Sequence, residues 1–418
     1  MKKKPTGKEV DPRDRAFGRR VADLRKTQGM TQQQLAALLN GRTSSWMSQV
    51  ERGIQPVHRM DVLRELADAL GVSVQALNPD VPVPAAHASD VPVKANDLDG
   101  ARLVIAGHPA LGTLLGTEES GAAPDLQEMA TEVEEVWSLT HQARHAEVSA
   151  MVTELVPALE RAVRTVPAAE RPAAYGLLAR AYQALASAFA RQGDARASWV
   201  SADRAVAAAE LSGDVLLVCA GVYRMVHAFV RLGDKEEAEH AVRSAIDSLS
   251  RREDLSPEGL SVLGSLHLAK ALVHARCSQR AEAKEEIENA RQVAARIGED
   301  RNDYNLEFGP TNVAIQAVST AVDLGDAGEA LEIGQTIDAE ALSPERRGRL
   351  LMDLGRAHAQ RRHMADATEC LLRAEEISPE TVQNHTAVRE AIKELVLVAG
   401  PKVSTDLMLL AERTGAME

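Results

Sequence analysis

The sequence predicts an all-α protein with a small N-terminal helical bundle, a linker and a long C-terminal α-solenoid. Three observations support this: composition, a division of charge and a repeated turn. The 418 residues are 45% hydrophobic but only 3% aromatic, so the core must be built mainly from Ala, Leu and Val. This composition favours closely packed helices over sheets, which are enriched in β-branched and aromatic residues.

Charge divides the chain into a basic head and an acidic body. Residues 1–78 hold 14 Lys and Arg against 8 Asp and Glu, a net charge of +6. The remaining residues, 79–418, carry a net charge of −19. This asymmetry is typical of a nucleic-acid-binding module attached to a non-binding domain, although a solvated basic face would produce it too.

Several classes of function are disfavoured. The three cysteines (Cys219, Cys277 and Cys370) stand alone, as expected of reduced thiols in a cytoplasmic protein without a metal site. The basic N-terminus is followed by no apolar segment, and no run approaches the ~18 apolar residues that span a membrane. No P-loop, GxSxG, HExxH or persuasive carboxylate pair occurs. We expect a soluble, cytoplasmic protein with no cofactor, membrane partner or enzymatic activity.

The basic head is expected to form five helices over residues 15–77. A first helix carries an apolar stripe and ends near Gly29. Thr31 caps the second helix, with Gln34 at the capping-box position, and the Asn-Gly pair at residues 40–41 breaks it. The stripe of the first helix consists of Phe17, Val21 and Leu24.

The stretch TSSWMSQVERG predicts the third helix, with Thr43 as its cap and with Met47 and Val50 facing inward. A fourth helix is expected from about Met60 to Leu70 and a last short turn from Ser73 to Leu77. Two short helices joined by a tight turn in a compact basic bundle form a helix-turn-helix arrangement.

GMTQQQLAALL followed by SQVERG resembles the Cro/C1-type (Xre-family) DNA-binding domain, over residues 15–77. The turn between the second and third helices, at residues 40–42, has one residue more than the usual family spacing, which would change the angle between these helices. Of the matching residues, the glutamate is expected to bond within the domain. The matching positions are Thr31, Gln32, Leu35, Ala36, Val50, Glu51 and Gly53.

The resemblance implies contacts with the bases of double-stranded DNA. Gln32 would bind a phosphate or a base edge. Ser44, Ser45 and Gln49 would reach base edges in the major groove, with Thr43 at the start of the same helix. A glutamine can pair bidentately with adenine, whereas a serine hydroxyl specifies weakly.

Other residues of the head are candidates for non-specific contacts. Arg42, Arg52 and Arg59 would bind phosphates, with ordinary surface charge as the alternative. Trp46 is expected to be partly buried rather than to contact DNA directly. Residues 1–14 are expected to form a flexible basic arm, and for Lys2–Lys4 within it a disordered tail is favoured over insertion into a minor groove.

Residues 78–125 are expected to connect the head to the body. Residues 78–97 are rich in Pro and Ala and predict an extended, semi-stiff linker. Residues 98–125 have a weak pattern, with a short helix or strand around residues 101–105. From residue 126 onward almost everything has a helical pattern.

A Gly-Asp turn recurs in the body as RQGDARAS, RLGDKEEA and DLGDAGEA, which place Gly193, Gly233 and Gly325 in equivalent positions. Equivalent turns without glycine fall near Ser278 and Arg362. Each turn follows a long apolar helix and precedes an Ala-rich one, which is the layout of a solenoid of helical hairpins.

The segment LMDLGRAHAQRRHMADATECLLRAEEISPE matches the tetratricopeptide (TPR) order best. We count about five hairpins over residues 171–379, flanked by helices at 126–166 and 381–412. Residues 126–418 therefore predict a TPR-like domain, with an irregular helical bundle as the alternative.

A Cro/C1-type head followed by TPR-like repeats resembles the peptide-sensing regulators of Gram-positive bacteria and similar regulators of actinobacteria. The resemblance implies a homodimer whose repeats bind a peptide or small-molecule effector and alter the spacing of the DNA-binding heads. The alternative is a DNA-localised scaffold controlled by a protein partner.

Effector-binding candidates come from the first helix of each hairpin, at positions expected to face the concave side. For the asparagine among them, capping its own helix is the alternative. The histidines of the body have no metal-ligand partners at convincing spacing and are expected to be structural. The candidates are Gln183, Tyr223, His227, Asn312, Arg349 and Arg356.

Overall fold

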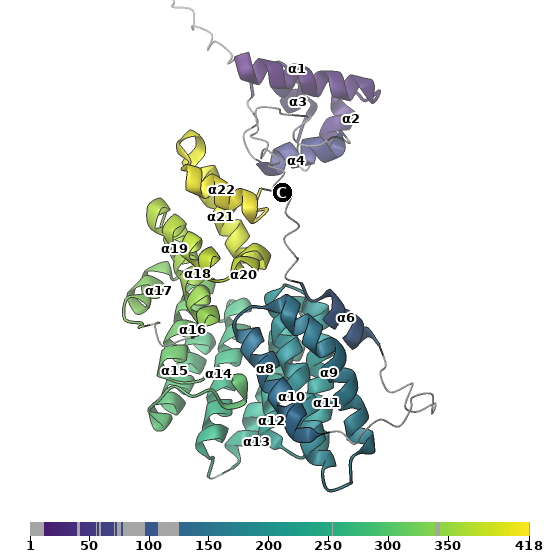
Figure 1. The fold of residues 1–418 in the computed structure, drawn as a ribbon. Helices are drawn as coiled ribbons and strands as arrows, with labels where there is room; N and C mark the ends of the chain where they lie inside the picture. Colours follow the sequence, from purple (N-terminus) through teal and green to yellow (C-terminus); the bar gives the residue numbers. More distant parts are fainter. Residues whose placement is uncertain are drawn as a thin grey trace, which may run out of the picture. The chain divides into compact units, whose positions relative to one another are not determined.

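The computed structural model consists of helices, as the sequence predicts, in two compact units, Met1–Pro92 and Val93–Glu418 (Figure 1). Among the described residues the only β-pairing is a single bridge between Arg301 and Phe308. The structure describes residues 12–39, 42–55, 57, 60–70, 72, 77, 97–107, 125–252, 254–338 and 343–417.

The N-terminal unit contains helices where the sequence predicts them. Their core is formed by apolar side chains that include Val21, Leu35, Met47 and Leu66, all fully buried. The Asn-Gly break at residues 40–41 and most of the expected last turn lie outside the described residues. The helices are α1 (Pro12–Thr27), α2 (Gln32–Ala37), α3 (Ser44–Glu51) and α4 (Met60–Ala69).

Side-chain caps start α2 and α3. The Thr31 hydroxyl accepts a bond from the Gln34 amide at 3.1 Å, and the Gln34 side chain accepts one from the Thr31 amide at 2.8 Å, which completes the predicted capping box. The Thr43 hydroxyl accepts a bond from the Trp46 amide at 3.2 Å. These bonds satisfy amides that a helix start otherwise leaves unpaired.

Gly53 ends α3 for two reasons. Its φ of +71° lies in the left-handed region, which a glycine adopts without the steric penalty of a side chain. A Cβ at this position would also lie 2.8 Å from the Cα of Arg15 in α1. The Glu-Arg-Gly ending therefore allows α1 and α3 to approach closely.

The C-terminal unit contains five helical hairpins in succession, so the expected solenoid is present (Figure 1). Each first helix packs on its own partner and on the first helix of the next hairpin, which gives a continuous inner row. The hairpins are α10 (Arg171–Arg191) with α11 (Ala195–Ser212), α12 (Val215–Leu232) with α13 (Lys235–Ser250), α14 (Pro257–Arg276) with α15 (Arg280–Ile297), α16 (Pro310–Asp323) with α17 (Ala327–Gly334), and α18 (Pro344–Gln360) with α19 (Met364–Ile377).

The turns within the hairpins share one backbone conformation. Gly193, Gly233 and Gly325 have φ values of 77°, 91° and 81°. Ser278 and Arg362, which the sequence pattern aligned with them, have φ values of 59° and 60°. The left-handed turn is thus retained where no glycine supplies it, at a cost of roughly 1–2 kcal/mol per residue.

Further helices flank the hairpins. Helix α6 (Asp99–Ala106) lies in the segment where the sequence left helix or strand open. It packs on α9, and the Ala101 amide donates to the Ser149 hydroxyl at 3.0 Å, so α6 belongs to the C-terminal unit. The other flanking helices are α8 (Leu126–His141), α9 (His145–Thr165), α20 (Pro379–Asn384), α21 (Thr386–Ala399) and α22 (Thr405–Arg413).

Helix α12 corrects the expectation that no segment approaches the length of a membrane span. Its 18 residues are sufficient for one by length and composition, although Arg224 and Arg231 interrupt the apolar run. In this structure α12 packs against α10, α11, α13 and α14. It is a central helix of the C-terminal unit.

The loop between α15 and α16 reaches back onto α14. It contains a short 3-10 helix, η1 (Asp303–Asn305), and ends in the fully buried Phe308. The Phe308 ring lies against Gly264 of α14, where an added Cβ would be 2.0 Å from the ring. A second 3-10 helix, η2 (Gly400–Lys402), precedes α22.

Candidate nucleic-acid interface and ligand cavity

Helix α3 presents polar side chains on one side and buries apolar ones on the other. Met47 and Val50 are fully buried, whereas Ser44 and Ser45 are exposed and Gln49 is half-buried. Within the described part of the chain, neither the two serine hydroxyls nor the side-chain amide of Gln49 forms a hydrogen bond. These three side chains are therefore available to an external partner.

Gln32, for which the family resemblance implies a contact with a phosphate or a base edge, forms a hydrogen bond within the domain. Its side-chain amide donates to Oε2 of Glu51 at 2.7 Å, and Arg25 donates to both oxygens of the same carboxylate, at 2.5 and 3.0 Å. Burial alone would raise the pKa of Glu51, but the bonds from Arg25 and Gln32 outweigh it and lower the pKa. Glu51 thus bonds within the domain, as predicted, and it holds Gln32.

The arginine candidates differ in their surroundings. The Arg42 guanidinium lies 4.7 Å from the centre of the Trp46 ring, and the tryptophan is half-buried. Arg52 is exposed, and its Nε donates to the Ser48 carbonyl at 3.2 Å. Arg59 lies outside the described residues.

In the C-terminal unit the first helices of four hairpins, α10, α12, α16 and α18, line a cavity of about 120 Å³. A neighbouring hollow of about 280 Å³ shares several of its lining residues, among them His227, Arg231 and Arg349. Four of the candidates named from the sequence line the first cavity: Tyr223, His227, Asn312 and Arg349.

The other two candidates, Gln183 and Arg356, are not among the residues that line either hollow. Gln183 is buried, and its amide donates to the Leu217 carbonyl at 3.0 Å. Arg356 bonds to Asp353 at 2.9 Å and to Asp323 at 2.7 Å. Both side chains are used in holding neighbouring helices together.

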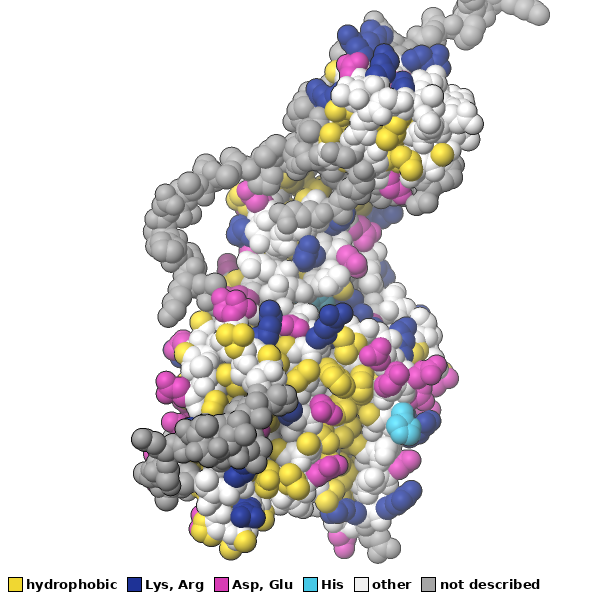
Figure 2. Space-filling view, turned by 90° about the vertical axis from the view of Figure 1, so that its right-hand side faces the viewer, with side chains coloured by type: hydrophobic (Ala, Val, Ile, Leu, Met, Phe, Trp, Pro, Cys, Tyr) yellow, Lys and Arg dark blue, Asp and Glu magenta, His cyan; other side chains and the backbone are white. Residues whose placement is uncertain are grey.

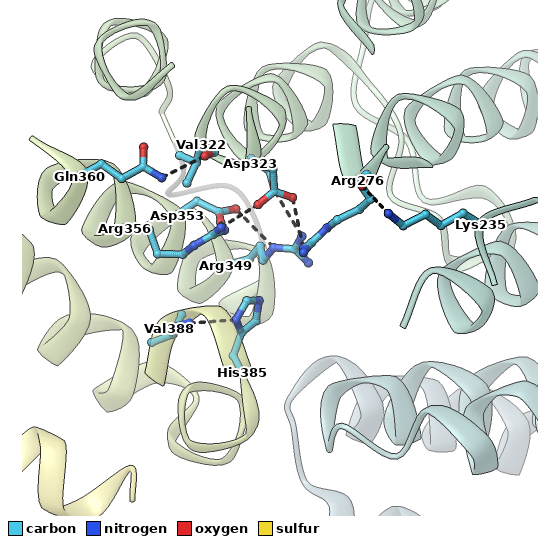
Figure 3. A network of polar contacts seen from close by, with 11 residues as sticks. Lys235, Arg276, Val322, Asp323, Arg349, Asp353, Arg356, Gln360, His385 and Val388 are labelled. Carbon is cyan, nitrogen blue, oxygen red and sulfur yellow. Dashed lines mark hydrogen bonds and ion pairs between the residues drawn. The ribbon is translucent and has the colours of Figure 1, made fainter. Parts of the chain in front are cut away.

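An ion-pair network supports one wall of the cavity (Figure 3). Asp323 of α16 pairs with Arg276 of α14 at 3.2 Å and with Arg356 of α18. Asp353 is almost completely buried and pairs with both Arg349, at 3.4 Å, and Arg356. The network joins three consecutive hairpins, and it orients Arg349.

The cavity also contains charged residues that sequence reasoning missed. A usable signal existed in α12: Arg224, His227 and Arg231 are spaced three and four residues apart, on one face of an otherwise apolar helix. The remaining charges come from helices and loops far apart in the sequence, so no local pattern brings them together. They are Arg191, Glu307, Glu345 and Arg346.

Two histidines of the cavity are held neutral. Burial lowers the pKa of His227 well below its ordinary value, and Arg231, Arg224 and Arg349 lower it further. Burial lowers the pKa of His385 to about 3, and the nearby arginines act in the same direction. Both imidazoles are therefore uncharged at neutral pH.

One group within the described residues has metal-ligand atoms close together, at the turn between α18 and α19. It consists of His358, His363 and Asp366, whose ligand atoms lie within 4.8 Å of one another. The two Nδ1 atoms are 3.4 Å apart. The sequence predicts no metal site, but the side chains of this group could hold a divalent ion through nitrogen and oxygen ligands.

Two solved structures show weak similarity to the chain. Bacillus thuringiensis PlcR in complex with the peptide PapR7 and DNA is 13% identical, covers 87% of this chain and 94% of its own, and has a TM-score of 0.33. A mutant of PrgX is 8% identical, covers 95% of this chain and 99% of its own, and has a TM-score of 0.26. TM-scores this low do not establish a shared fold. No curated protein has significant similarity to the chain.

The family comparison concerns the N-terminal unit. Residues 16–78 match the family model described as a helix-turn-helix domain. The match includes most of α1 and all of α2, α3 and α4, with the two capped helices and the polar side of α3. Residues 16–78 of this chain are therefore a helix-turn-helix domain.

Proposed function

We propose that the protein is a cytoplasmic, sequence-specific DNA-binding transcriptional regulator whose C-terminal solenoid dimerises and binds a peptide or small-molecule effector. The observation that carries the DNA-binding part is the helix-turn-helix domain, with an α3 whose Ser44, Ser45 and Gln49 side chains form no hydrogen bond with the described residues. In such domains the second helix of the motif enters the major groove.

The geometry of α3 supports sequence reading. Its apolar side is anchored by Met47 and Val50, and its C-terminal end is fixed by the pair between Glu51 and Arg25. A glutamine on a fixed helix can pair with both the N6 and N7 positions of adenine, a contact worth about 1–3 kcal/mol of discrimination. Gln49 is therefore the proposed base-reading residue.

The effector part rests on the cavity. It is lined by the first helices of four of the five hairpins and by residues of the α15–α16 loop and α20. A ligand that contacts these elements at the same time would favour one arrangement of the hairpins over others. Such differential affinity is what an effector needs in order to shift a conformational equilibrium.

Dimerisation follows from the way such heads read DNA. Paired helix-turn-helix domains bind two half-sites about one helical turn apart. The body exposes large hydrophobic side chains, among them Leu103, Trp199 and Leu211. Figure 2 shows that hydrophobic side chains form a broad area on one face of the body, with scattered acidic ones, and such areas are typical of interaction surfaces.

DNA selection tests the proposal. The full-length protein is used to enrich duplexes from a random library, in parallel with Gln49→Ala and with Gln55→Ala, which removes an exposed glutamine outside α3. We expect a two-fold symmetric site for the wild type and Gln55→Ala, and loss of preference at one position per half-site for Gln49→Ala. Absence of any enriched site would contradict the proposal.

A further inference from the structure

The ligand cavity contains a cationic side chain without a counter-charge. Arg231 has no hydrogen-bonding or ion-pair partner within the described part of the chain. Its surface is exposed to the hollow, yet protein surrounds it on most sides, and this enclosure, with Arg349, Arg276 and Arg191 nearby, lowers its pKa to about 10. The guanidinium is charged at neutral pH, and the charged groups that act on it most among the described residues are these three arginines.

Two further polar atoms of residues that line the cavity lack hydrogen-bonding partners among the described residues. The Nε2 atom of His227 is buried and has none among the described residues. The Nε atom of Arg224 is likewise buried and has no hydrogen-bonding partner among the described residues. Its Nη2 donates to the Asn305 carbonyl at 2.6 Å, and its guanidinium lies 5.2 Å from the Tyr223 ring centre and 5.3 Å from that of Trp137. Buried polar atoms without partners are uncommon, and such atoms are satisfied when a water molecule or a ligand group bonds to them.

The carboxylates that line the cavity are already used. Glu345 pairs with Arg191 at 2.5 Å, and Glu307 pairs with Arg346. The aspartates of the supporting network are paired with Arg276, Arg349 and Arg356 (Figure 3). No described acidic side chain of the cavity is left to neutralise Arg231 or Arg224.

This excess of positive charge lies in a protein whose net charge is −13. An unpaired guanidinium beside three other arginines costs free energy through like-charge repulsion, which the exposure of Arg231 to the hollow reduces but does not remove. A hollow with an excess of one sign of charge also attracts ions of the opposite sign. The arrangement is thus unfavourable when empty and favourable when an anion occupies it.

We propose that the effector is an anion whose carboxylate or phosphate group binds Arg231, with His227, Arg224 and Arg349 around it. The inference rests on the proposed function in calling this ligand the effector. The neutral His227 can present either a donor or an acceptor at Nε2, depending on its tautomer. The acidic group belongs either to a small organic acid or phosphate compound, or to the C-terminus of a peptide.

Thermal unfolding of the full-length protein tests the inference. The melting temperature is measured at neutral pH with inorganic phosphate, with citrate, and with a pool of random heptapeptides carrying free or amidated C-termini, each against sodium chloride of equal ionic strength. We expect at least one acidic probe to raise the melting temperature by about 2–4 °C over chloride. A response to free but not amidated peptides identifies a peptide carboxylate.

Arg231→Gln provides the decisive variant. It should lose the response to the acidic probe and, without any probe, melt at a higher temperature than the wild type, because it removes like-charge repulsion. Arg243→Gln, which changes an exposed arginine on α13, should respond as the wild type does. A purely structural role for Arg231 predicts the opposite change in the unliganded melting temperature.

Two outcomes would overturn the inference: a wild type that responds to none of the acidic probes, or an Arg231→Gln variant that keeps the full response. Neither affects the DNA-selection result, which uses no ligand. If a DNA site is enriched while no acidic probe acts, only the anionic effector is excluded. If an acidic probe acts and no DNA site is enriched, the proposed function fails and the anion site remains.

Discussion

Glu51 stabilises the head through three bonds from two helices. It accepts two bonds from Arg25 of α1 and one from Gln32 of α2, and both members of the ion pair are about nine-tenths buried. Removing one partner of a buried pair leaves the other charge without compensation. This residue therefore determines how α1, α2 and α3 fit together.

Glu51→Ala should destabilise the helix-turn-helix domain by about 3 kcal/mol, since Arg25 would stay buried and unpaired. The free energy of unfolding of the head, followed by urea denaturation, measures this effect. Asp23→Asn, at an exposed position of α1, should change it by less than about 0.5 kcal/mol. Equal unfolding midpoints for Glu51→Ala and the wild type would exclude the role given to Glu51.

A second glutamate, Glu286, joins α14 to α15. Burial by itself would raise its pKa, but the hydrogen bonds from His267 and Lys270, at 2.6 and 2.7 Å, lower it to about 2. Because the folded-state pKa lies below the ordinary value of 4.5, the charged form stabilises the fold. This contribution is present above pH 4.5 and is lost as the pH falls through about 2.

Glu286→Gln should therefore lower stability by about 1–3 kcal/mol at neutral pH, and the gap to the wild type should narrow below pH 4.5. The free energy of unfolding measured from pH 6 to pH 2 tests this. Glu236→Gln, at an exposed position of α13, should follow the wild-type curve. A constant gap between wild type and Glu286→Gln over the whole range would contradict the assignment.

Which single residues could be predicted depends on how local their roles are. Thr31 and Thr43 were predicted as caps because a cap bonds within its own turn. The bond from Gln32 to Glu51 was not predicted, because it joins residues of α2 and α3 that meet only in the folded domain. The same applies to Arg231, whose like-charged neighbours come from α10, α14 and α18.

At the scale of helices, turn chemistry predicted the hairpins well. The Gly-Asp turns indicate where the first helix of a hairpin ends and the second begins. Ser278 and Arg362, which align with these turns, adopt the same left-handed backbone conformation without glycine. Helix α6 was left open because eight residues with weak periodicity do not distinguish a helix from a strand. It is defined by its packing on α9.

Packing between α14 and the α15–α16 loop predicts a contrast between two helical glycines. Gly264→Ala should destabilise the body by about 1–3 kcal/mol, because its Cβ would fall within 2.0 Å of the Phe308 ring. Gly176→Ala, in α10, meets nothing nearer than 3.9 Å and should stabilise by about 0.5–1 kcal/mol. Thermal unfolding compares the two, and a Gly264→Ala variant as stable as Gly176→Ala would contradict the tight contact.

At the scale of the whole molecule, the division of charge in the sequence corresponds to two structural units. The basic head is the helix-turn-helix domain, and the acidic body is the solenoid. The body nevertheless contains a hollow with an excess of positive charge. The net charge of the body could not predict it, because the arginines that line it lie far apart in the sequence, between Arg191 and Arg349. Only the stacking of consecutive hairpins brings them together.

The central claim is that α3 reads DNA through Gln49. The most direct test is the dissociation constant of the full-length protein for its selected duplex and for a shuffled duplex, measured by fluorescence anisotropy at one fixed salt concentration. We predict that Gln49→Ala weakens binding to the selected duplex by about 1–3 kcal/mol and leaves binding to the shuffled duplex unchanged. Equal affinities of wild type and Gln49→Ala for the selected duplex would contradict it.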